Sequence, residues 1–378
     1  MEHKKIRVLH MTDILSYGAG VSSVILSFIE GTDETRVLCD VAVTKEGDFP
    51  LYEKVAKKGG QVHQLPPTTL NTKTYKTALK ELLEKENYDI IHGHVANSGF
   101  LYFPIAKEAG ITHRIIHSHN SRGSDVPIKA LRNRFLNRNL THLANHFFAC
   151  STEAGTFLFG EGIAKEKMVV FPNAIDTEKF SFSPDKRVLE RHSLGIPDST
   201  MVIGHVGRMV PQKNQVFLLR AFAAYHRMVP DSLLCLVGDG PLKSDLMNQA
   251  ENLQLTGAVR FLGLQSNTAP FYQVFDQFWM PSLFEGLPVS ALEAQAAGLP
   301  CLLSDHVSFE TNVTGYCSFF STDSPRSVEN WAESAVDLGK NHARADGALL
   351  VKKSGYDILA EGQRLTSLYE DLSKIEEL

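Results

Sequence analysis

The chain has 378 residues, of which 43% are hydrophobic and 21% are charged, and its formal net charge is −5. This length exceeds that of a typical domain, so we expect two domains with separate cores, and the composition is ordinary for a water-soluble enzyme. No apolar run approaches the roughly 18 residues of a membrane-spanning helix, and the N-terminus enters a strand without the apolar segment of a signal peptide. The sequence therefore predicts a cytoplasmic protein.

Cysteine usage and charge narrow the class further. The five cysteines lie far apart and form no Cys-x-x-Cys pair, which favours a reduced protein and gives no support to a zinc site. Residues 1–180 carry 22 Lys and Arg against 20 Asp and Glu, whereas residues 181–378 carry 16 against 23. The acidic second half argues against a nucleic-acid partner, and the mildly basic first half is compatible with an anionic surface.

Short apolar runs alternate with helical patterns in the first half, as is typical of an α/β protein with a parallel sheet. Strands are expected at Ile6–Met11, Arg36–Val43, Gln61–Leu65, Ile90–His92, Arg114–Ile116, His146–Ala149 and Met168–Phe171. Helices are expected at Ser22–Ile29, Leu51–Lys58, Thr72–Glu86, Ser98–Ala109, Ile128–Asn145 and Glu153–Phe159.

The same alternation restarts after a stretch punctuated by proline and glycine, so we place a linker near residues 178–200. We predict two doubly wound Rossmann-like domains, at residues 1–180 and 200–355, that face each other across a cleft, with ligands beyond the carboxyl ends of the strands. Strands are expected at Val202–Val206, Ser232–Val237, Val259–Leu262, Gln277–Met280 and Cys301–Ser304. Helices are expected at Asn214–Met228, Leu242–Leu253, Ala269–Val274 and Val289–Ala297.

Two glutamates flank a helix start in the segment FEGLPVSALE. Pro288 suits the first helical position, so we expect Glu285 on the loop before the helix and Glu293 in its second turn. The N–H groups from Leu287 and Val289 onward form an anion site. A diphosphate there would have one carboxylate near the hydroxyls of a sugar and the other near a ribose. The competing interpretation is an acid at the helix start and a solvated acid on the helix.

Two further segments suit a phosphate group. Arg208 and Lys213 lie in a turn between a strand and a helix, where charge-assisted bonds to a diphosphate are strong; the alternative is two surface cations. Gly18 and Gly20 lie between the first strand and the first helix. This segment lacks the third glycine of a dinucleotide-binding fingerprint. It is better explained as a loop that approaches a phosphate at the start of a helix.

Two His-x-His pairs follow strands in the first half, at His92 with His94 and at His117 with His119. Side chains at these strand ends are expected to face the cleft, where they would position the reacting hydroxyl or the donor sugar. No cysteine or carboxylate accompanies them, so we expect no metal ligand set. Structural hydrogen bonding is the alternative for His92 and His94.

Residues 128–140 form a basic amphipathic stretch. Its two interpretations are core packing with a solvated basic face and peripheral docking on an anionic membrane. The apolar face would hold Ile128, Leu131, Phe135 and Leu136, with Lys129, Arg132, Arg134 and Arg138 around it.

Together these motifs resemble those of the family 4 retaining glycosyltransferases of GT-B fold, over nearly the whole chain. The markers are the E-x7-E element at Glu285 and Glu293, the turn with Arg208 and Lys213, and the segments VGDGPL at 237–242 and PNAID at 172–176. The spellings HSHN and LAEGQRLTSLYEDL are most similar to the bacterial capsular and exopolysaccharide branch. The resemblance also implies that a closing helix within residues 356–378 crosses back onto the first domain.

The resemblance implies a role for each motif residue. Two segments of this sequence differ from the family pattern. The first loop lacks the acid that many members have after its glycines, and Leu287 and Pro288 replace a glycine-rich spelling, so the donor sugar stays open. The implied contacts are Arg208 and Lys213 with the diphosphate, Glu285 with sugar hydroxyls, Glu293 with ribose, Gly18 and Gly20 with phosphates, Leu287 and Val289 through backbone amides, and His117 with the sugar or acceptor, with His119 and His94 as further candidates.

The expected reaction is transfer of a sugar from a nucleotide-diphosphate donor, a UDP-sugar, to a glycan or lipid-linked acceptor in surface polysaccharide biosynthesis. No DxD triplet occurs, so we expect no metal and no cofactor besides the donor substrate. Competing interpretations are a nucleotide-sugar epimerase or phosphorylase of the same fold, and a non-catalytic nucleotide-sugar-binding protein. A nicotinamide oxidoreductase lacks support because the third glycine is missing.

Overall fold

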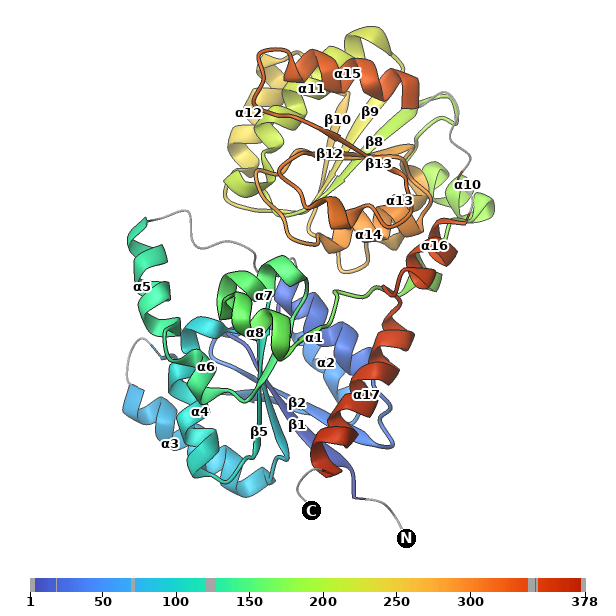
Figure 1. Cartoon of the computed structure of the whole chain (residues 1–378). Coiled ribbons are helices and arrows are strands. Elements are labelled where there is room, and N and C mark those ends of the chain that lie inside the picture. The colour runs from blue at the N-terminus through green and yellow to red at the C-terminus, as the bar shows by residue number, and fades with distance from the viewer. Residues whose placement is uncertain are drawn as a thin grey trace. The chain divides into compact units, whose positions relative to one another are not determined.

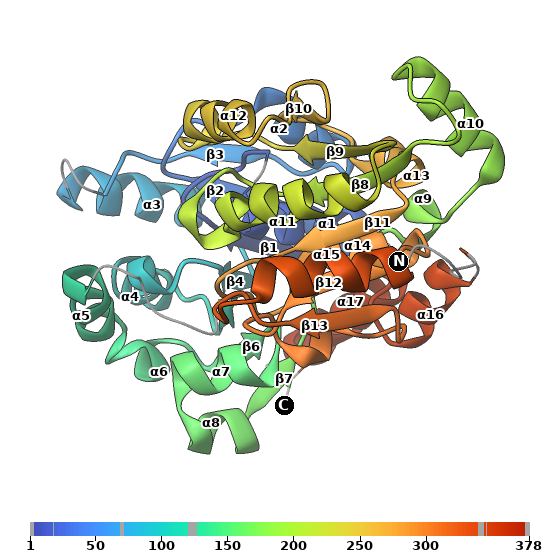
Figure 2. The same ribbon diagram turned by 90° about the horizontal axis from the view of Figure 1, so that it is seen from above.

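The computed structural model describes residues 4–17, 19–68, 72–119, 127–338, 344 and 346–374. Its contacts divide the chain into two compact units, drawn in Figures 1 and 2. Unit 1 holds Met1–Ala174 and Ile358–Leu378, and unit 2 holds Ile175–Asp357. Both are α/β units with a parallel sheet, as the alternating pattern predicts.

Unit 1 is built on a seven-stranded parallel sheet in the order β3-β2-β1-β4-β5-β6-β7. From β1 the chain adds β2 and β3 on one side of the sheet and then β4 to β7 on the other. The carboxyl ends of β1 and β4 therefore flank the switch point at which ligands bind in such sheets. The strands are β1 Ile6–Met11, β2 Val37–Val43, β3 Val62–Gln64, β4 Ile90–Gly93, β5 His113–Ser118, β6 His146–Ala149 and β7 Met168–Val170.

The helices of unit 1 cover this sheet, and the C-terminal helix α17 packs against α1 (Figure 1). Gly31 and Gly362 let the two backbones touch, because a Cβ on either residue would overlap the other helix. The helices are α1 Gly20–Gly31, α2 Phe49–Lys57, α3 Thr72–Glu86, η1 Ala96–Ser98, α4 Gly99–Glu108, α5 Pro127–Asn137, α6 Leu140–Leu143, α7 Thr152–Phe159, α8 Glu161–Glu166 and α17 Ile358–Lys374.

Unit 2 is built on a six-stranded parallel sheet in the order β10-β9-β8-β11-β12-β13. Here β8 and β11 are neighbours although they are far apart in sequence, so the loops that follow them meet at one edge. The strands are β8 Met201–Val206, β9 Ser232–Val237, β10 Val259–Gly263, β11 Gln277–Met280, β12 Cys301–Ser304 and β13 Cys317–Phe320.

Apolar clusters pack on both faces of the unit 2 sheet, and α11 lies beside α15 on one of them (Figure 2). The helices are α9 Thr177–Phe180, α10 Pro184–Ser193, η2 Pro211–Lys213, α11 Gln215–Met228, α12 Lys243–Asn252, α13 Ala269–Val274, α14 Val289–Ala296, η3 Phe309–Thr311, α15 Ser327–Leu338 and α16 Gly347–Lys353.

The structure differs from the sequence expectations in three places. The boundary falls between Ala174 and Ile175 rather than at residue 180, because α10 is anchored to unit 2 by Arg187 and Arg191, both paired with Asp276. The single helix expected over 128–145 is interrupted between α5 and α6. The strand β13, the helices α8, α9, α10, α15 and α16, and the short helices η1, η2 and η3 were not expected.

Candidate functional site

The loops after β8 and β11 are joined at the carboxyl edge of the unit 2 sheet. Leu283 N–H donates to the Gln212 carbonyl at 2.8 Å, and Gln212 Nε2 donates to the Phe284 carbonyl at 3.0 Å. An ion pair completes the junction, with Lys213 Nζ at 2.5 Å from Glu285 Oε1. Two predicted donor-site residues that are 72 positions apart in the numbering thus lie in direct contact.

A buried histidine and a glutamine shape the turn that carries Arg208. His205 Nδ1 lies 2.8 Å from the Trp279 carbonyl, which fixes that nitrogen as the donor, and Gln215 Nε2 bonds His205 Nε2 at 3.2 Å. The same amide donates to the Arg208 carbonyl at 2.8 Å. Burial lowers the pKa of His205 to about 4, so this ring is neutral at pH 7 and acts as a support for the turn.

Arg208 itself is exposed, and among the residues that the structure describes its guanidinium has no hydrogen-bond or ion-pair partner. A cation held by its backbone, with its head group free, is suited to receive an anionic ligand. The guanidinium of Arg208 is therefore free and the ammonium of Lys213 is paired, and the binding role expected for both residues stays a prediction.

Helix α14 begins with an open N-terminus. Pro288 is its N-cap and provides no side-chain cap, and the first turn holds no acid. Ala291 and Leu292 bond back to the Pro288 carbonyl, whereas for Val289 and Ser290 no acceptor is found in the described part of the chain. Exposed first-turn N–H groups and the helix dipole favour an anion here.

Glu293 lies in the second turn of α14, as expected, but it is not a freely solvated acid. Its Oε2 accepts a hydrogen bond of 2.7 Å from Tyr272 Oη on α13. Burial raises the pKa of this carboxyl to about 7, although the bonds from Tyr272 and Thr268 and the charge of Lys179 act to lower it. At neutral pH Glu293 is therefore balanced between its two protonation states.

In unit 1 the predicted glycine loop is only partly described. Gly18 lies outside the described residues, whereas Gly20 is exposed and begins α1, whose N-cap Ala19 offers no side-chain cap. A Cβ at Gly20 would meet open space. Packing therefore does not require glycine at this position.

The two His-x-His pairs come together at the carboxyl edge of the unit 1 sheet, and His10 of β1 joins them. His94 Nδ1 lies 2.9 Å from His119 Nε2, and His94 Nε2 lies 3.0 Å from His10 Nδ1. His92 Nε2 lies 3.3 Å from His117 Nδ1. We call these five residues the histidine cluster.

Burial governs the charge of the histidine cluster. It lowers the pKa of His10 to about 3 and of His119 to about 4, and it holds those of His92, His94 and His117 well below 6.5. His117 is 1% exposed, whereas His119 is partly exposed. Of the two candidates for contact with a reacting group, His119 is the one that reaches the surface.

Helix α5 exposes two apolar residues of the basic stretch, whereas Leu136 is partly buried and the side chains of Ile128, Lys129 and Arg134 lie outside those that the structure describes. Leu131 and Phe135 are 70% and 60% exposed, so the interpretation that these two side chains pack in the core is wrong. Arg132 on the same helix and Arg138, which follows its last residue, are exposed, and the Arg138 guanidinium lies 4.2 Å from the centre of the Phe135 ring. In the part of the chain that the structure describes, no helix has the length and apolar character to cross a membrane.

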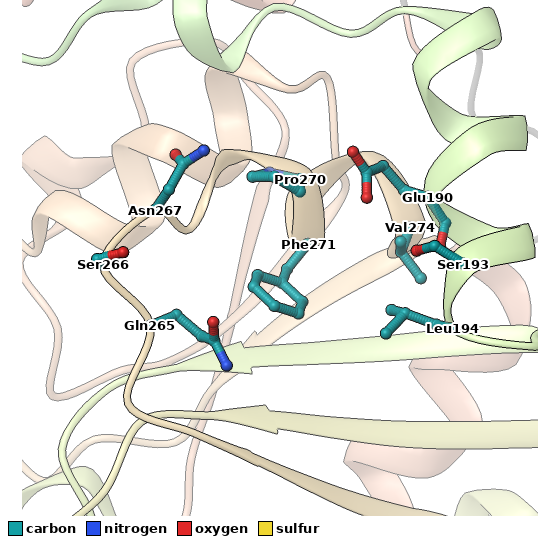
Figure 3. A pocket seen from close by; sticks show the side chains of 9 residues that line it. All are labelled: Glu190, Ser193, Leu194, Gln265, Ser266, Asn267, Pro270, Phe271 and Val274. Atoms are coloured by element: carbon teal, nitrogen blue, oxygen red, sulfur yellow. The ribbon is translucent and has the colours of Figure 1, made fainter.

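A surface hollow of about 290 Å³ lies elsewhere in unit 2, between α10 and α13 (Figure 3). Glu190 is the only ionisable residue that lines it, and no predicted site residue does. Its lining residues include no ion pair like that of Lys213 and Glu285. Its lining residues are Glu190, Ser193, Leu194, Gln265, Ser266, Asn267, Pro270, Phe271 and Val274.

Sequence reasoning missed four contributors to these sites: His10, His205, Gln215 and Tyr272. His10 and His205 had a usable signal, because each lies near the carboxyl end of a strand. Gln215 and Tyr272 had none, because they act through hydrogen bonds that only tertiary packing creates.

Two family patterns match the chain. Residues 18–179 match Glycosyltransferase Family 4, and residues 187–342 match Glycosyl transferases group 1. The two matches meet near the boundary between unit 1 and unit 2. Each unit is thus recognised as one half of the same kind of enzyme.

Relatives and solved structures agree with these matches. EpsF of Bacillus subtilis (strain 168), which is named as a glycosyltransferase, is 31% identical over 345 residues, or 88% of each chain. UDP-Gal:alpha-D-GlcNAc-diphosphoundecaprenol alpha-1,3-galactosyltransferase of Escherichia coli is 28% identical over 80% of each chain. The fold is similar to that of Anabaena HepE in complex with UDP-glucose, with a TM-score of 0.78, 18% identity, and coverage of 97% of this chain and 100% of that one.

The WaaG structure, a glycosyltransferase involved in lipopolysaccharide biosynthesis, has a similar fold, with a TM-score of 0.69, 14% identity, and coverage of 97% of this chain and 99% of that one. The fold, the two family matches and the long alignment with EpsF point to one conclusion. The chain is a glycosyltransferase of family 4, with the GT-B fold, related to enzymes of exopolysaccharide biosynthesis.

Proposed function

We propose that the chain is a retaining, metal-independent hexosyltransferase that moves a sugar from a UDP-sugar to a glycan or lipid-linked acceptor in surface polysaccharide biosynthesis. The observation that carries this proposal is the junction, in unit 2, between the turn that holds Arg208 and Lys213 and the loop that leads from Glu285 to the uncapped N-terminus of α14. Two cations and first-turn N–H groups suit a diphosphate, and carboxylates beside them suit sugar hydroxyls.

Support for the donor and the acceptor comes from similar proteins. HepE has been crystallised with UDP and with UDP-glucose. The Escherichia coli relative is named for a UDP-galactose donor and a diphosphoundecaprenol-linked acceptor. Both names fit a uridine diphosphate donor for this chain.

In the proposed reaction the bond between the anomeric carbon and the diphosphate oxygen breaks, and the negative charge moves onto the diphosphate. Arg208, Lys213 and the N–H groups of Val289 and Ser290 stabilise that charge. The acceptor oxygen forms its bond on the face from which the diphosphate leaves, and its proton passes to a departing phosphate oxygen. Because these groups supply the positive charge, transfer needs no Mg²⁺ or Mn²⁺.

We further propose that α5 holds the enzyme at the inner face of an anionic membrane. Leu131 and Phe135 would enter the interface while Arg132 and Arg138 contact lipid head groups. The segment 127–140 contains no Asp or Glu that would oppose such contact. A lipid-linked acceptor would then be met at the surface in which it resides.

The test is product analysis with the purified full chain. UDP-, GDP- and ADP-sugars are each supplied with an undecaprenyl-diphosphate-linked sugar, and the new glycosidic bond is assigned by NMR. Transfer from a UDP-sugar, with the donor's anomeric configuration and without added Mg²⁺ or Mn²⁺, is expected. An inverted product, strict dependence on either ion, or release of a sugar phosphate when inorganic phosphate replaces the acceptor would overturn the proposal.

A further inference from the structure

The histidine cluster brings together five imidazoles from three neighbouring strands and the residues that follow them. His10 and His92 are register partners on β1 and β4. The rings are stacked, with centroids 4.4 Å apart for His92 and His94 and 4.3 Å apart for His117 and His119. Stacking brings their ring nitrogens into one small volume.

These nitrogens form two overlapping triads of the size of a metal coordination sphere. One triad is His10, His92 and His94, the other is His94, His117 and His119, and within each the ligand atoms lie within 4.8 Å of one another. Tetrahedral zinc with Zn–N bonds of about 2.0–2.1 Å separates its ligand nitrogens by roughly 3.3–3.5 Å. Within the first triad His10 Nδ1 lies 3.0 Å from His94 Nε2, and within the second His94 Nδ1 lies 2.9 Å from His119 Nε2, so these pairs require only small shifts.

Two features of the histidine cluster point to a ligand beyond the imidazoles themselves. His10 is fully buried, and its Nε2 has no hydrogen-bond partner among the described residues. The Nδ1 atom of His119 is also buried without a partner there, although the residue as a whole is partly exposed. A buried polar atom without a partner is costly. In addition, His92 Nδ1 lies 2.7 Å from Tyr369 Oη of α17, the kind of outer contact that fixes the orientation of a metal-ligating histidine.

We propose that the histidine cluster binds one divalent transition-metal ion of the zinc class, with His94 as the ligand that both triads share. The expectation of no metal site rested on two His-x-His pairs without another ligand, and His10 supplies it. Neutral imidazole is the commonest protein ligand for such ions. The ion would join the carboxyl ends of β1, β4 and β5 within unit 1, so this proposal does not depend on the diphosphate contacts of unit 2.

The experiment uses the full chain without an affinity tag, stripped by a chelator and then titrated with Zn²⁺ by calorimetry and with Co²⁺ by visible absorption. About one ion per chain and the absorption of tetrahedral cobalt are expected. His94→Gln should abolish both signals, and His10→Gln and His119→Gln then assign the triad. Where loss of binding in His10→Gln assigns the ion to the triad of His10, His92 and His94, Tyr369→Phe, which keeps all ligands, should weaken binding about 10–100-fold, because Tyr369 contacts His92.

The matched control is His146→Gln, because His146 forms a pair with His113 at 3.2 Å in the same sheet, and this pair belongs to no group of three possible ligands among the described residues. This variant should bind Zn²⁺ as the wild type does. No Zn²⁺ uptake by the stripped wild-type chain, or equal uptake by the His94→Gln chain, would overturn the proposal. If His94→Gln does not fold by circular dichroism, unchanged Zn²⁺ affinity in both His10→Gln and His119→Gln, one ligand from each triad, would overturn it instead.

Discussion

Lys213 Nζ lies 2.5 Å from Glu285 Oε1, and the two side chains are only 16% and 13% exposed. The pair connects the loop after β8 with the loop after β11, and it keeps a cation and an anion side by side at the edge where a donor is expected. A bound diphosphate would compete with Glu285 for Lys213, and sugar hydroxyls would take up the carboxylate. The ion pair thus keeps both side chains at the edge where the donor is expected to bind.

Removal of either partner of this pair is expected to destabilise unit 2. Lys213→Ala leaves a partly buried carboxylate without its cation and should cost about 1–3 kcal/mol in the free energy of unfolding. Glu285→Ala should cost less, because a lysine side chain can turn its ammonium toward water. Urea denaturation of both variants and of the double variant measures the coupling, and additive losses would show that the two residues do not interact.

Arg208→Ala should lower kcat on the order of 10²–10³-fold, because it removes one cation from the developing diphosphate charge. The free energy of unfolding should change by less than about 0.5 kcal/mol, since the guanidinium is exposed. Lys243→Ala is the control, because Lys243 is a surface cation of the same unit that pairs with Asp239 at 2.8 Å. Equal turnover in the two variants would remove Arg208 from the mechanism.

Stability should depend on pH through Glu293. Burial raises the pKa of this carboxyl from 4.5 to about 7, so the folded chain holds a proton that the unfolded chain has released. This contribution is complete below pH 4.5 and is lost as the pH rises through 7. Glu293→Gln should therefore gain stability relative to the wild type between pH 5 and pH 8, on the order of 2 kcal/mol.

Thermal unfolding of both chains across this pH range measures the effect of Glu293. Tyr272→Phe removes a bond that lowers the pKa of Glu293, so it should move the midpoint of the pH dependence upward. Glu310→Gln, a change at an exposed acid of the same unit, should leave the wild-type profile intact. Parallel profiles for wild type and Glu293→Gln would contradict the raised pKa.

Gly362→Ala should weaken the attachment of α17 to α1, because the added methyl group would overlap the backbone of Gly31. Overpacking of this kind costs about 1–3 kcal/mol, although alanine favours a helix by up to about 1 kcal/mol over glycine. Gly162→Ala isolates that second effect, since Gly162 lies in α8 with open space around it. Chemical denaturation should therefore show opposite signs for the two changes.

Phe135→Ala should reduce binding to anionic vesicles about tenfold, because it removes one apolar anchor from the interface. Phe49→Ala is the matched change, since Phe49 is 70% exposed on another helix of unit 1. It should sediment with phosphatidylglycerol vesicles as the wild type does, and high salt should release both. Equal loss in the two variants, or binding that Phe135→Ala leaves unchanged, would contradict docking through α5.

The strands of both sheets were predictable where short apolar runs stand between helical patterns, as at Val37–Val43 and Ser232–Val237. The strand β13 was not expected, because Cys317–Phe320 gains its place from pairing with β12. The stretch 178–200 was expected to be a linker, whereas the contacts place it in unit 2, and the ion pairs of Arg187 and Arg191 with Asp276 that attach it there cannot be read from local pattern.

The sequence by itself determined the two α/β units, the position of Glu285 before a helix and of Glu293 within it, and the turn with Arg208 and Lys213, because these follow from local periodicity and helix punctuation. Only the tertiary structure decided that Lys213 contacts Glu285, that Tyr272 donates to Glu293, and that His10 completes the histidine cluster. The order of parallel strands within a sheet is set by packing and not by their order along the chain. The residues that meet at one edge of the sheet therefore come from distant segments of the sequence.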